Sequence, residues 1–554
     1  MGLIMKGKIG KRTWTRILAA LFCLSLGLPA TLLGAAAAPP DSPKIVEEVR
    51  AIIKYHYPLD VPSGVDKATT IKGMLEALGD PYAQYMTAKE YTDFIGEINR
   101  TFVGVGVFLE AHPDGILVRQ VFSGTPAQAA GLLAGDVIVA ADGKPLKGLS
   151  PEAAANLIRG EAGSGVTLKW RRGGQEFSQT LIRAEIQAPL VEGELVGTVG
   201  YIALYSFGDG LTEQFEAIVK ELRKAGAKTW LIDLTYNGGG IVDEALTLLG
   251  CFIGEKEAVT WKMAGIRITE KSIPQETIIQ EPVILLTNNY TASASEIVTG
   301  ALKDHRAAAV LGEQTYGSGR FKSAFRLSNG DFLYMTITQF YSPYNIAVDA
   351  VGLAPHVKLN EQEAVRAGML LLKSGPLETE PAAGKPPAAS TPKAKDETGY
   401  LRVMVGPQLY RAALSDWQQE EYWGAGQRLL DAMYWTTMID VGTADGWRAI
   451  PEEYLKERWR IYYPGYTVLT QQIIASQGSS TIKAILSSDL QGRLAQAQLI
   501  DALSGQRIQC AVEPASGGFK MTPSGKLAAR HEYWLVIPGS DGKTGGIAIV
   551  RTRD

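Results

Sequence analysis

The sequence predicts an α/β protein whose central part contains a mostly parallel sheet. Short apolar segments alternate with helical segments across residues 200–311, and this alternation is typical of strands that are joined by helices. Two unusual segments, Asn237-Gly-Gly-Gly240 and the one around Ser293, each follow a predicted strand. Ligand sites of such sheets lie beyond the carboxyl ends of the strands, so we expect both segments to lie there.

The elements of this central part follow one another in a regular order. From the hydrophobic patterns we predict strand 200–204, helix 211–224, strand 229–234, a helix from Asp243, strand 283–287, a helix from Ser293 and strand 309–311. Farther along the chain, Leu327-Ser-Asn-Gly330 is predicted to be a hairpin turn.

The N-terminus is predicted to be a secretory signal that spans residues 1–38. Five basic residues precede an apolar run from Ile17 to Leu33 and four alanines that end at Ala38. The run is long enough that an uncleaved membrane anchor is the alternative, and this anchor is the one membrane contact that the sequence indicates. In either case we expect the rest of the chain to work outside the cytoplasm, secreted, periplasmic or attached to the cell envelope.

Length and composition exclude several classes of function. The 554 residues are 46% hydrophobic, which is enough for about three or four domains. Basic and acidic residues nearly balance at 55 and 58, so nucleic-acid binding is not expected. The five histidines are scattered and no metal-binding spacing occurs, so no metal and no cofactor is expected. Cys251 and Cys510 fall in different predicted domains, which favours free thiols.

The first predicted domain after the signal is helical and covers residues 41–100. Apolar residues recur at helical spacing from Ile45 to Ile53 and again from Ile71 to Leu78. We interpret this part as a helical brace.

An ordered series of glycine-containing turns follows in residues 101–184. The series contains Gly124-Thr-Pro-Ala127, Ala130-Gly-Leu132, Ala134-Gly-Asp-Val-Ile138, the turn Asp142-Gly143 and a helix over 151–159. In this order the segments resemble a PDZ domain. The resemblance implies that an extended C-terminal peptide is added as a strand and that backbone N–H groups hold its carboxylate. These binding roles fall to Val103, Gly104, Val105, Gly106 and Val107, with Leu157 in the side-chain pocket. A role of these glycines in turn geometry alone is the alternative.

The segment Tyr290-Thr-Ala-Ser-Ala-Ser-Glu-Ile297 indicates nucleophilic catalysis. Ser293 stands at a predicted helix start among small residues, which let a substrate backbone approach closely. The segment resembles the nucleophile motif of the C-terminal processing, or tail-specific, proteases, which use a Ser/Lys dyad. The resemblance covers roughly residues 41–370 and implies that Ser293 is the nucleophile of a serine peptidase. Glu296, one turn farther on, is interpreted as a helix-positioning residue and not as an acid.

A glycine-rich turn supplies the expected oxyanion site. The family pattern Asp-Leu-Arg-Asn-Asn-Pro-Gly-Gly reads Asp233-Leu-Thr-Tyr-Asn-Gly-Gly-Gly240 in this chain. The resemblance assigns the two oxyanion donors to the N–H groups of Gly239 and Ala294. A plain turn between a strand and a helix is the alternative.

The general base is the point at which the chain departs from the family pattern. The dyad lysine lies in a Thr-Phe-Gly-Lys-Gly turn, and the same turn here is Thr315-Tyr-Gly-Ser-Gly319, with Ser318 at the lysine position. Lys322 lies four residues on, and alternate residues of a strand share a face, so Lys322 is a candidate relocated base. A solvated strand lysine is the alternative. Arg320 cannot be the base because it stays charged, and His305 lies about 18 Å along the helix from Ser293.

These observations divide the chain and support two functions. The predicted divisions are signal 1–38, helical region 41–100, PDZ domain 101–184, protease core 185–372, a Pro/Ala-rich linker 373–399, an aromatic and partly helical region 400–466, and a small β-sandwich 467–554. The first function is an extracytoplasmic serine endopeptidase that binds protein or peptide substrates through their C-termini. The alternative is an inactive homologue that binds peptides as a scaffold at the cell envelope. The substrate and the oligomeric state are not assigned by the sequence.

Overall fold

A computed structural model describes the protein in two compact units. The described residues are 39–263, 266–276, 279–374, 398–406, 408–432, 437–443, 446–475, 482–485, 493–515 and 518–552. One unit contains the described residues up to Ala188 together with Thr260–Glu270 and Gly319–Tyr341. The other contains Pro189–Val259, Lys271–Ser318 and the described residues from Ser342 onward.

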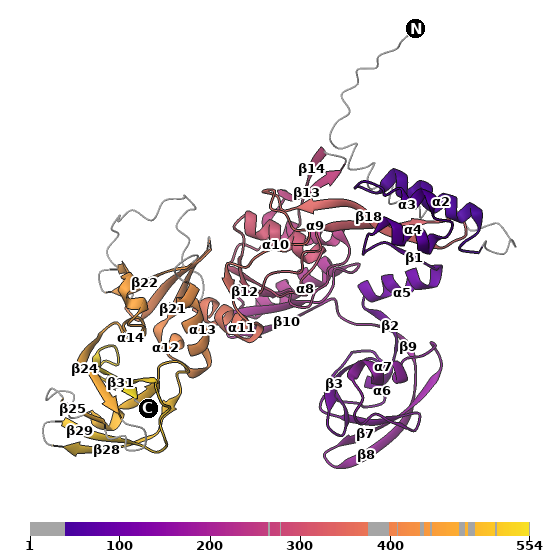
Figure 1. Cartoon of the computed structure of the whole chain (residues 1–554). Helices are drawn as coiled ribbons and strands as arrows, with labels where there is room; N and C mark the ends of the chain where they lie inside the picture. The colour runs from indigo at the N-terminus through magenta and orange to yellow at the C-terminus, as the bar shows by residue number, and fades with distance from the viewer. Residues whose placement is uncertain are drawn as a thin grey trace, which may run out of the picture. The chain divides into compact units, whose positions relative to one another are not determined.

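The second unit contains a six-stranded sheet that confirms the predicted α/β class. Its strands, in spatial order, are β10 (Val191–Val196), β11 (Val199–Leu204), β12 (Thr229–Asp233), β15 (Val283–Thr287), β16 (Ala309–Gly312) and β19 (Val357–Lys358). Figure 1 labels β10 and β12 of this sheet. Only the β10–β11 pair is antiparallel, and the other four pairs are parallel. The structure therefore confirms the mostly parallel sheet.

Helices follow the strands of this sheet as predicted. They are α8 (Leu211–Ala225), α9 (Val242–Ile253), α10 (Ala294–Asp304) and α11 (Glu361–Leu372). Every residue of β12 and β15 is buried, because layers cover both faces of these two strands. On one face, α11 packs so closely that a Cβ atom at Gly368 would lie 2.7 Å from the Leu231 side chain.

The N-terminal helices belong to the first unit. They are α2 (Pro43–His56), α3 (Gly64–Lys67), α4 (Ile71–Leu78) and α5 (Ala88–Ile98). Apolar residues of α2, α3 and α4 share one core with Leu327, Leu333 and Met335 of the hairpin formed by β17 (Arg320–Arg326) and β18 (Phe332–Tyr341), and Tyr91 of α5 stacks on Phe332 of β18. β18 also pairs with β1 (Gln84–Met86) and with β13 (Glu257–Met263), which precedes β14 (Ile266–Lys271). The helices thus brace the hairpin that carries Lys322.

A second sheet of the first unit lies where the sequence resembles a PDZ domain. Its order is β3 (Val107–His112), β4 (Gly115–Val121), β5 (Val137–Ala141), β7 (Gly165–Arg172) and β8 (Gln175–Ile182), with β6 (Lys144–Pro145) beside β5. Buried residues of these strands form one core with residues of α6 (Pro126–Ala129) and α7 (Pro151–Ile158). Separately, β2 (Thr101–Gly104) pairs with β9 (Ala184–Gln187).

The region from Tyr400 contains more strand than we predicted. It has the helices α12 (Leu414–Trp417), α13 (Glu420–Ala432) and α14 (Trp459–Tyr462), the 3₁₀ turn η1 (Glu452–Leu455), and the strands β20 (Tyr400–Val405), β21 (Gln408–Ala413), β22 (Thr437–Thr443) and β23 (Gly446–Ala449). In β20 the fully buried residues Leu401, Val403 and Val405 alternate with polar or half-buried ones. This period of two is a strand pattern, and the run of aromatic residues around it concealed it. Residues 375–397, the main part of the predicted linker, lie outside the described residues.

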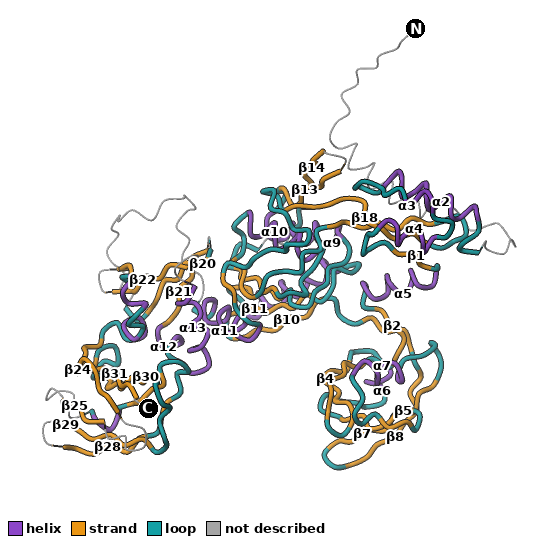
Figure 2. Tube along the Cα trace, viewed as in Figure 1, coloured by secondary structure: helices purple, strands orange, loops and turns teal. Residues whose placement is uncertain are grey.

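The C-terminal part of the chain is mostly strands, which appear in orange in Figure 2. One sheet has the order β24 (Tyr466–Ala475), β31 (Gly545–Thr552), β30 (Glu532–Pro538), β26 (Gln498–Asp501) and β27 (Arg507–Ile508). The other has the order β25 (Ile482–Ile485), β29 (Gly518–Pro523) and β28 (Cys510–Ala515). Leu499 and Leu535 of the first sheet share a core with Phe519 and Met521 of the second, which supports the predicted sandwich.

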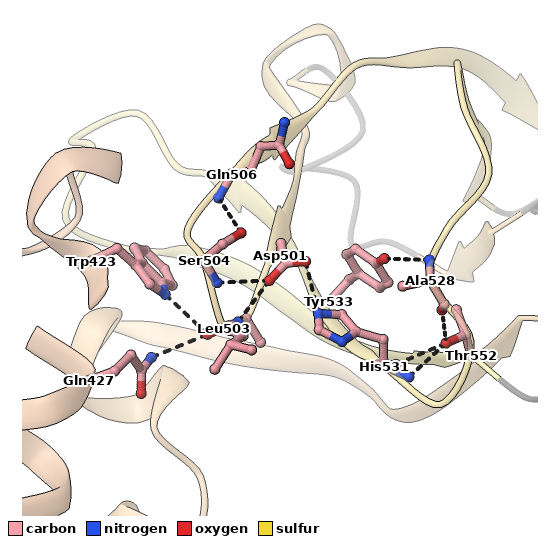
Figure 3. Close-up of polar contacts among 11 residues, drawn as sticks. Trp423, Gln427, Asp501, Leu503, Ser504, Gln506, Ala528, His531, Tyr533 and Thr552 are labelled. Atoms are coloured by element: carbon pink, nitrogen blue, oxygen red, sulfur yellow. Dashed lines mark hydrogen bonds and ion pairs between the residues drawn. The ribbon is translucent and has the colours of Figure 1, made fainter. Parts of the chain in front are cut away.

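One turn joins this strand-rich part to α13. The carbonyl of Ala502 accepts hydrogen bonds from Trp423 Nε1 at 3.0 Å and from Gln427 Nε2 at 3.2 Å. Asp501 accepts the N–H of Ser504 with one carboxylate oxygen, and its other oxygen lies 2.8 Å from His531 Nε2 (Figure 3). Hydrogen bonds to α13 and contacts within the C-terminal strands therefore both hold this turn.

The region after Tyr400 also packs against the six-stranded sheet. Tyr410 Oη donates to the carbonyl of Val283 at 3.1 Å, and Leu401 and Trp423 belong to the same buried cluster as Leu231 of the sheet. Gly406 lies so close to His356 that a Cβ atom there would be 2.5 Å from the imidazole ring. The C-terminal region is thus part of the same compact unit as the sheet.

Two expectations concern cysteine and the membrane. Cys251 is buried, Cys510 is partly buried, and both are free, as predicted. Among the described residues, no helix has the length and apolar character needed to cross a membrane. The predicted signal of residues 1–38 lies outside the described residues.

Candidate active site

Three loops meet at the carboxyl ends of β12, β15 and β16. These strands are neighbours in the sheet, and the loops after them contain Asn237–Gly240, Tyr290–Ser293 and Thr315–Ser318, respectively. The two segments singled out in the sequence therefore lie at the same end of the sheet, because the strands are parallel.

Asn237 ties the first loop to the second. Its backbone carbonyl accepts hydrogen bonds from the N–H of Ala292 and from Ser295 Oγ, both at 3.0 Å. Its side-chain Nδ2 donates to the carbonyl of Leu204 at 2.9 Å, and the residue is fully buried. In the neighbouring contact, Thr291 Oγ1 donates to the carbonyl of Leu234 at 2.9 Å. These bonds fix the glycine turn against the segment that precedes α10.

Ser293 occupies a strained position at the start of α10. Its backbone has φ 56° and ψ −116°, a conformation that residues other than glycine rarely adopt and that costs on the order of 1–3 kcal/mol. A sharp turn of this kind at the entrance of a helix presents the hydroxyl outward.

Gly239 lies directly against Ser293. A Cβ atom on Gly239 would be 2.8 Å from the Ser293 Cβ and 2.7 Å from the Ala292 carbonyl oxygen, and φ of this glycine is +101°. Both the close approach and the positive φ require glycine. The sequence placed both segments beyond the carboxyl ends of their strands, and the structure shows that Gly239 and Ser293 lie against each other.

The two predicted oxyanion donors differ in their hydrogen bonding. The Ala294 N–H, at the first position of α10, finds no acceptor among the described residues. The Gly239 N–H instead donates to Asn237 Oδ1 at 2.9 Å. A substrate carbonyl at Gly239 would have to replace that bond, which the sequence did not indicate.

Glu296 connects α10 to the third loop. Its buried carboxylate, 1% exposed, accepts the N–H groups of Ser293 at 2.9 Å, Gly317 at 2.7 Å and Ser318 at 2.8 Å, and the Thr315 hydroxyl at 2.6 Å. Burial raises the pKa of this carboxyl, although the hydrogen bonds oppose the shift. Because these bonds use its oxygens, Glu296 positions the two loops. The sequence predicted a positioning role, but it gave no signal for the bonds to Thr315 and Ser318.

The candidate base Lys322 lies on β17, in the first unit. Its Nζ is 4.7 Å from the centre of the Tyr82 ring, and the Arg320 guanidinium lies 5.8 Å from the same ring. The two cations therefore share a strand face, as the period of two predicted. An aromatic face stabilises the charged ammonium, whereas a base must be neutral. Ser318, at the expected lysine position, is 4% exposed. The role of Lys322 as a base stays a prediction.

His305 is placed far from Ser293, at the opposite end of α10. It caps the C-terminus of this helix, and its Nε2 lies 2.6 Å from the carbonyl of Glu257. The helix spans Ala294–Asp304, so the distance along its axis that argued against His305 holds.

The predicted peptide-binding residues of the PDZ-like sheet divide into two groups. Val107 begins β3, an edge strand, and α7, which carries Leu157, contacts β3. The N–H groups of Val105 and Gly106 find no acceptor among the described residues. Val103 and Gly104 belong to β2 and pair with β9. The five residues therefore do not form one continuous strand, because Val105 and Gly106 lie between β2 and β3.

Comparison with protein families agrees with this arrangement. Residues 198–359 match the model of peptidase family S41, and residues 117–172 match a PDZ domain. The first match covers the strands from β11 to β19 of the six-stranded sheet, with the three loops, and the second covers the part of the PDZ-like sheet from β4 to β7. The chain therefore contains a region similar to peptidase family S41 and a region similar to a PDZ domain.

Its relatives with curated names are CtpA-like proteins. The chain is 31% identical over 324 residues to the "Probable CtpA-like serine protease" of Staphylococcus saprophyticus and 30% identical over 319 residues to that of Staphylococcus aureus. These matches cover 58% and 57% of this chain, and they span just under two thirds of the relatives, 66% and 64%. A photosystem II D1 C-terminal processing protease aligns with 57% of this chain and 92% of its own, at 24% identity and a TM-score of 0.38. Since that score is below 0.5, the assignment rests on the sequence matches.

Proposed function

We propose that the protein is a serine endopeptidase that acts outside the cytoplasm on proteins captured through their C-termini. The observation that carries this proposal is the contact between Gly239 and the strained Ser293 at the start of α10. Strain at a buried turn persists only where surrounding bonds hold it, and here Asn237 and Glu296 supply them. We also propose the domain limits predicted from the sequence.

In the proposed reaction, Ser293 Oγ attacks the carbonyl carbon of the scissile peptide bond. The oxyanion is bound by the Ala294 N–H, and the Gly239 N–H joins it by exchanging its bond to Asn237 Oδ1. A neutral amine, predicted to be that of Lys322, takes the hydroxyl proton and passes it to the leaving amine. Water then releases the acyl group from Ser293.

Substrate capture is assigned to the PDZ domain. A C-terminal segment would pair with the edge strand β3, and the N–H groups of Val105 and Gly106 would hold its carboxylate. Leu157 on α7 would line the pocket for the terminal side chain. The predicted signal of residues 1–38 supports an extracytoplasmic location.

Two observations favour a second candidate, an inactive homologue that binds peptides as a scaffold. Ser318 occupies the position of the dyad lysine, and the Gly239 N–H is already bonded within its own turn. An inactive protein would keep the PDZ groove and lose turnover. Fold and family membership do not decide between the two candidates.

Labelling with a fluorophosphonate, a probe that reacts with activated serines, separates the candidates. The endopeptidase predicts labelling of the wild type and its loss in Ser293→Ala, together with loss of cleavage of a denatured protein. Ser504→Ala, in a turn of the C-terminal part, serves as the matched control and should label normally. Equal labelling of the wild type and Ser293→Ala would favour the scaffold.

A further inference from the structure

Three exposed tyrosines lie at the carboxyl ends of the strands, one on each of the three loops that meet there. Tyr236 precedes Gly239 by three residues, Tyr290 precedes Ser293 by three, and Tyr316 precedes Ser318 by two. Their exposed fractions are 59%, 59% and 60%. Aromatic rings stabilise a complex most when an apolar group covers them. Exposed rings at this place therefore indicate a binding site for an apolar group.

The backbones of these tyrosines are fixed by buried groups. The side-chain oxygen of Asn288, 4% exposed, accepts the N–H of Tyr236 at 3.1 Å and the N–H of Tyr290 at 3.0 Å. The Tyr316 N–H donates to the carbonyl of Thr291 at 2.9 Å. The loops therefore hold all three residues close to the segment that leads into Ser293.

Tyr236 and Tyr290 form a rigid pair. Their ring centroids are 5.3 Å apart with an interplanar angle of 25°, which is a stacked arrangement. The Tyr236 hydroxyl donates to Glu361 Oε2 at 2.7 Å, and this bond raises the pKa of the phenol. The ring is thus held at both ends while its surface stays exposed.

The backbone of Tyr236 is unfavourable for an aromatic residue. Its φ is +62°, a region that glycine and asparagine enter far more readily. The family pattern quoted above has asparagine at this position, so the chain replaces a residue suited to this turn by one that is not. A cost of this kind is expected where the side chain has a function.

We propose that Tyr236 and Tyr290 form a specificity subsite that binds an aromatic or large aliphatic side chain of the polypeptide substrate beside the scissile bond. The proposal rests on the proposed function, because it takes the Ser293 site as the place where the polypeptide lies. The two tyrosines belong to the same loops as Gly239 and Ser293. They offer aromatic faces, which favour an apolar side chain over an acidic one.

The test is equilibrium binding by fluorescence anisotropy in the full-length Ser293→Ala protein. Two labelled peptides are compared that differ only in one central residue, phenylalanine or alanine. Both have amidated C-termini, so that the PDZ domain has no carboxylate to bind. Tyr236→Asn removes one ring while keeping a residue that tolerates positive φ, and Tyr290→Ala removes the other.

Tyr344→Ala is the matched control. Tyr344 is 63% exposed, and its N–H bonds to Asp304 at the far end of α10. We expect the phenylalanine peptide to bind about 3- to 10-fold more tightly than the alanine peptide in the Ser293→Ala parent and in the control. The preference should fall below about 2-fold in Tyr236→Asn and Tyr290→Ala.

A preference that survives in both ring variants, or is absent from the parent, overturns the subsite. The values of kcat/KM for the same two sequences with free C-terminal carboxylates, measured with an intact Ser293, separate this result from the proposed function. Cleavage without a preference would leave the endopeptidase and remove the subsite. Selective binding without any cleavage would support the subsite and contradict the proposed endopeptidase activity.

Discussion

The two ends of the six-stranded sheet are built differently. At the carboxyl ends of β12, β15 and β16 lie a strained serine, a glycine turn and exposed tyrosines. At the amino ends of β15 and β16 lie buried contacts, in which Tyr410 bonds to Val283 and His356 bonds to Val310. The same strands thus support reactive groups at one end and an anchor for the C-terminal region at the other.

This difference predicts which substitutions each end of the sheet tolerates. The loops at the carboxyl ends are held by side-chain bonds such as those of Asn237 and Glu296, so their exposed side chains can vary while the backbone stays in place. At the amino ends, the side chains of Tyr410 and His356 themselves form the contacts with the sheet. Substitutions at the carboxyl end should therefore change activity, whereas those at the amino end should change stability.

The largest effect is expected from Lys322→Ala, which tests the predicted base. If Lys322 takes the Ser293 proton, cleavage of a denatured protein should fall by about 10²–10⁴-fold. The thermal melting curve should move little, because the side chain is half-buried. Arg326→Ala, at an exposed position on the same strand, is the control. Cleavage retained in Lys322→Ala would rule out the relocated base.

The next effect concerns pH and the amino end of the sheet. Burial lowers the pKa of His356 from 6.5 to about 4, and the neutral imidazole accepts the Val310 N–H at 2.9 Å. Since the folded pKa lies below the unfolded one, this contribution to the free energy of unfolding is complete above pH 6.5. It is lost as the pH falls from 6.5 to about 4, with a total of at most about 3 kcal/mol.

Urea unfolding of the wild type and of His356→Asn between pH 4 and 8 tests this loss of stability. Asparagine places an acceptor near the position of Nδ1 but does not titrate. The wild type should lose more stability than the variant as the solution is acidified. Parallel pH profiles of the two proteins would contradict the assignment.

A gain of function is expected from Ser318→Lys at the carboxyl end. The Ser318 N–H bonds to Glu296 independently of the side chain, so the backbone should remain in place. A lysine at this buried position loses solvation, which favours the neutral amine that a base requires. We expect kcat/KM to rise by about tenfold. An unchanged kcat/KM would show that the missing lysine is not what limits activity. The hydrogen bond that the Gly239 N–H makes within its own turn would then be the first alternative cause.

The smallest effect is expected from Tyr410→Phe at the amino end. The substitution removes the buried hydrogen bond to Val283 and should lower the free energy of unfolding by about 1 kcal/mol without changing cleavage. Tyr400→Phe, on the neighbouring strand, keeps the ring that Arg411 covers and is the control. Equal stability of the two variants would show that the Tyr410 bond does not anchor the region.

Most of the fold around the candidate site was predictable from local patterns. Strand 283–287 was predicted with the bounds of β15, and the helix at Ser293 begins within one residue of α10. The sequence placed the segments of Gly239 and Ser293 at one end of the sheet, because parallel strands end together. The region 400–466 was predicted less well, since its short strands lie among aromatic residues that suit helices and strands alike.

The sequence by itself determined the order of strands and helices, the serine peptidase motif and the missing lysine, because these depend on periodicity and on residues close together in the chain. The tertiary structure alone decided that Glu296 bonds to the turn at Thr315–Ser318, that Asn237 takes the Gly239 N–H, and that Tyr410 anchors on Val283. A buried polar group must find a partner wherever packing places one. Glu296 and Tyr410 find theirs 19 to 127 residues away along the chain, a separation at which local patterns carry no information.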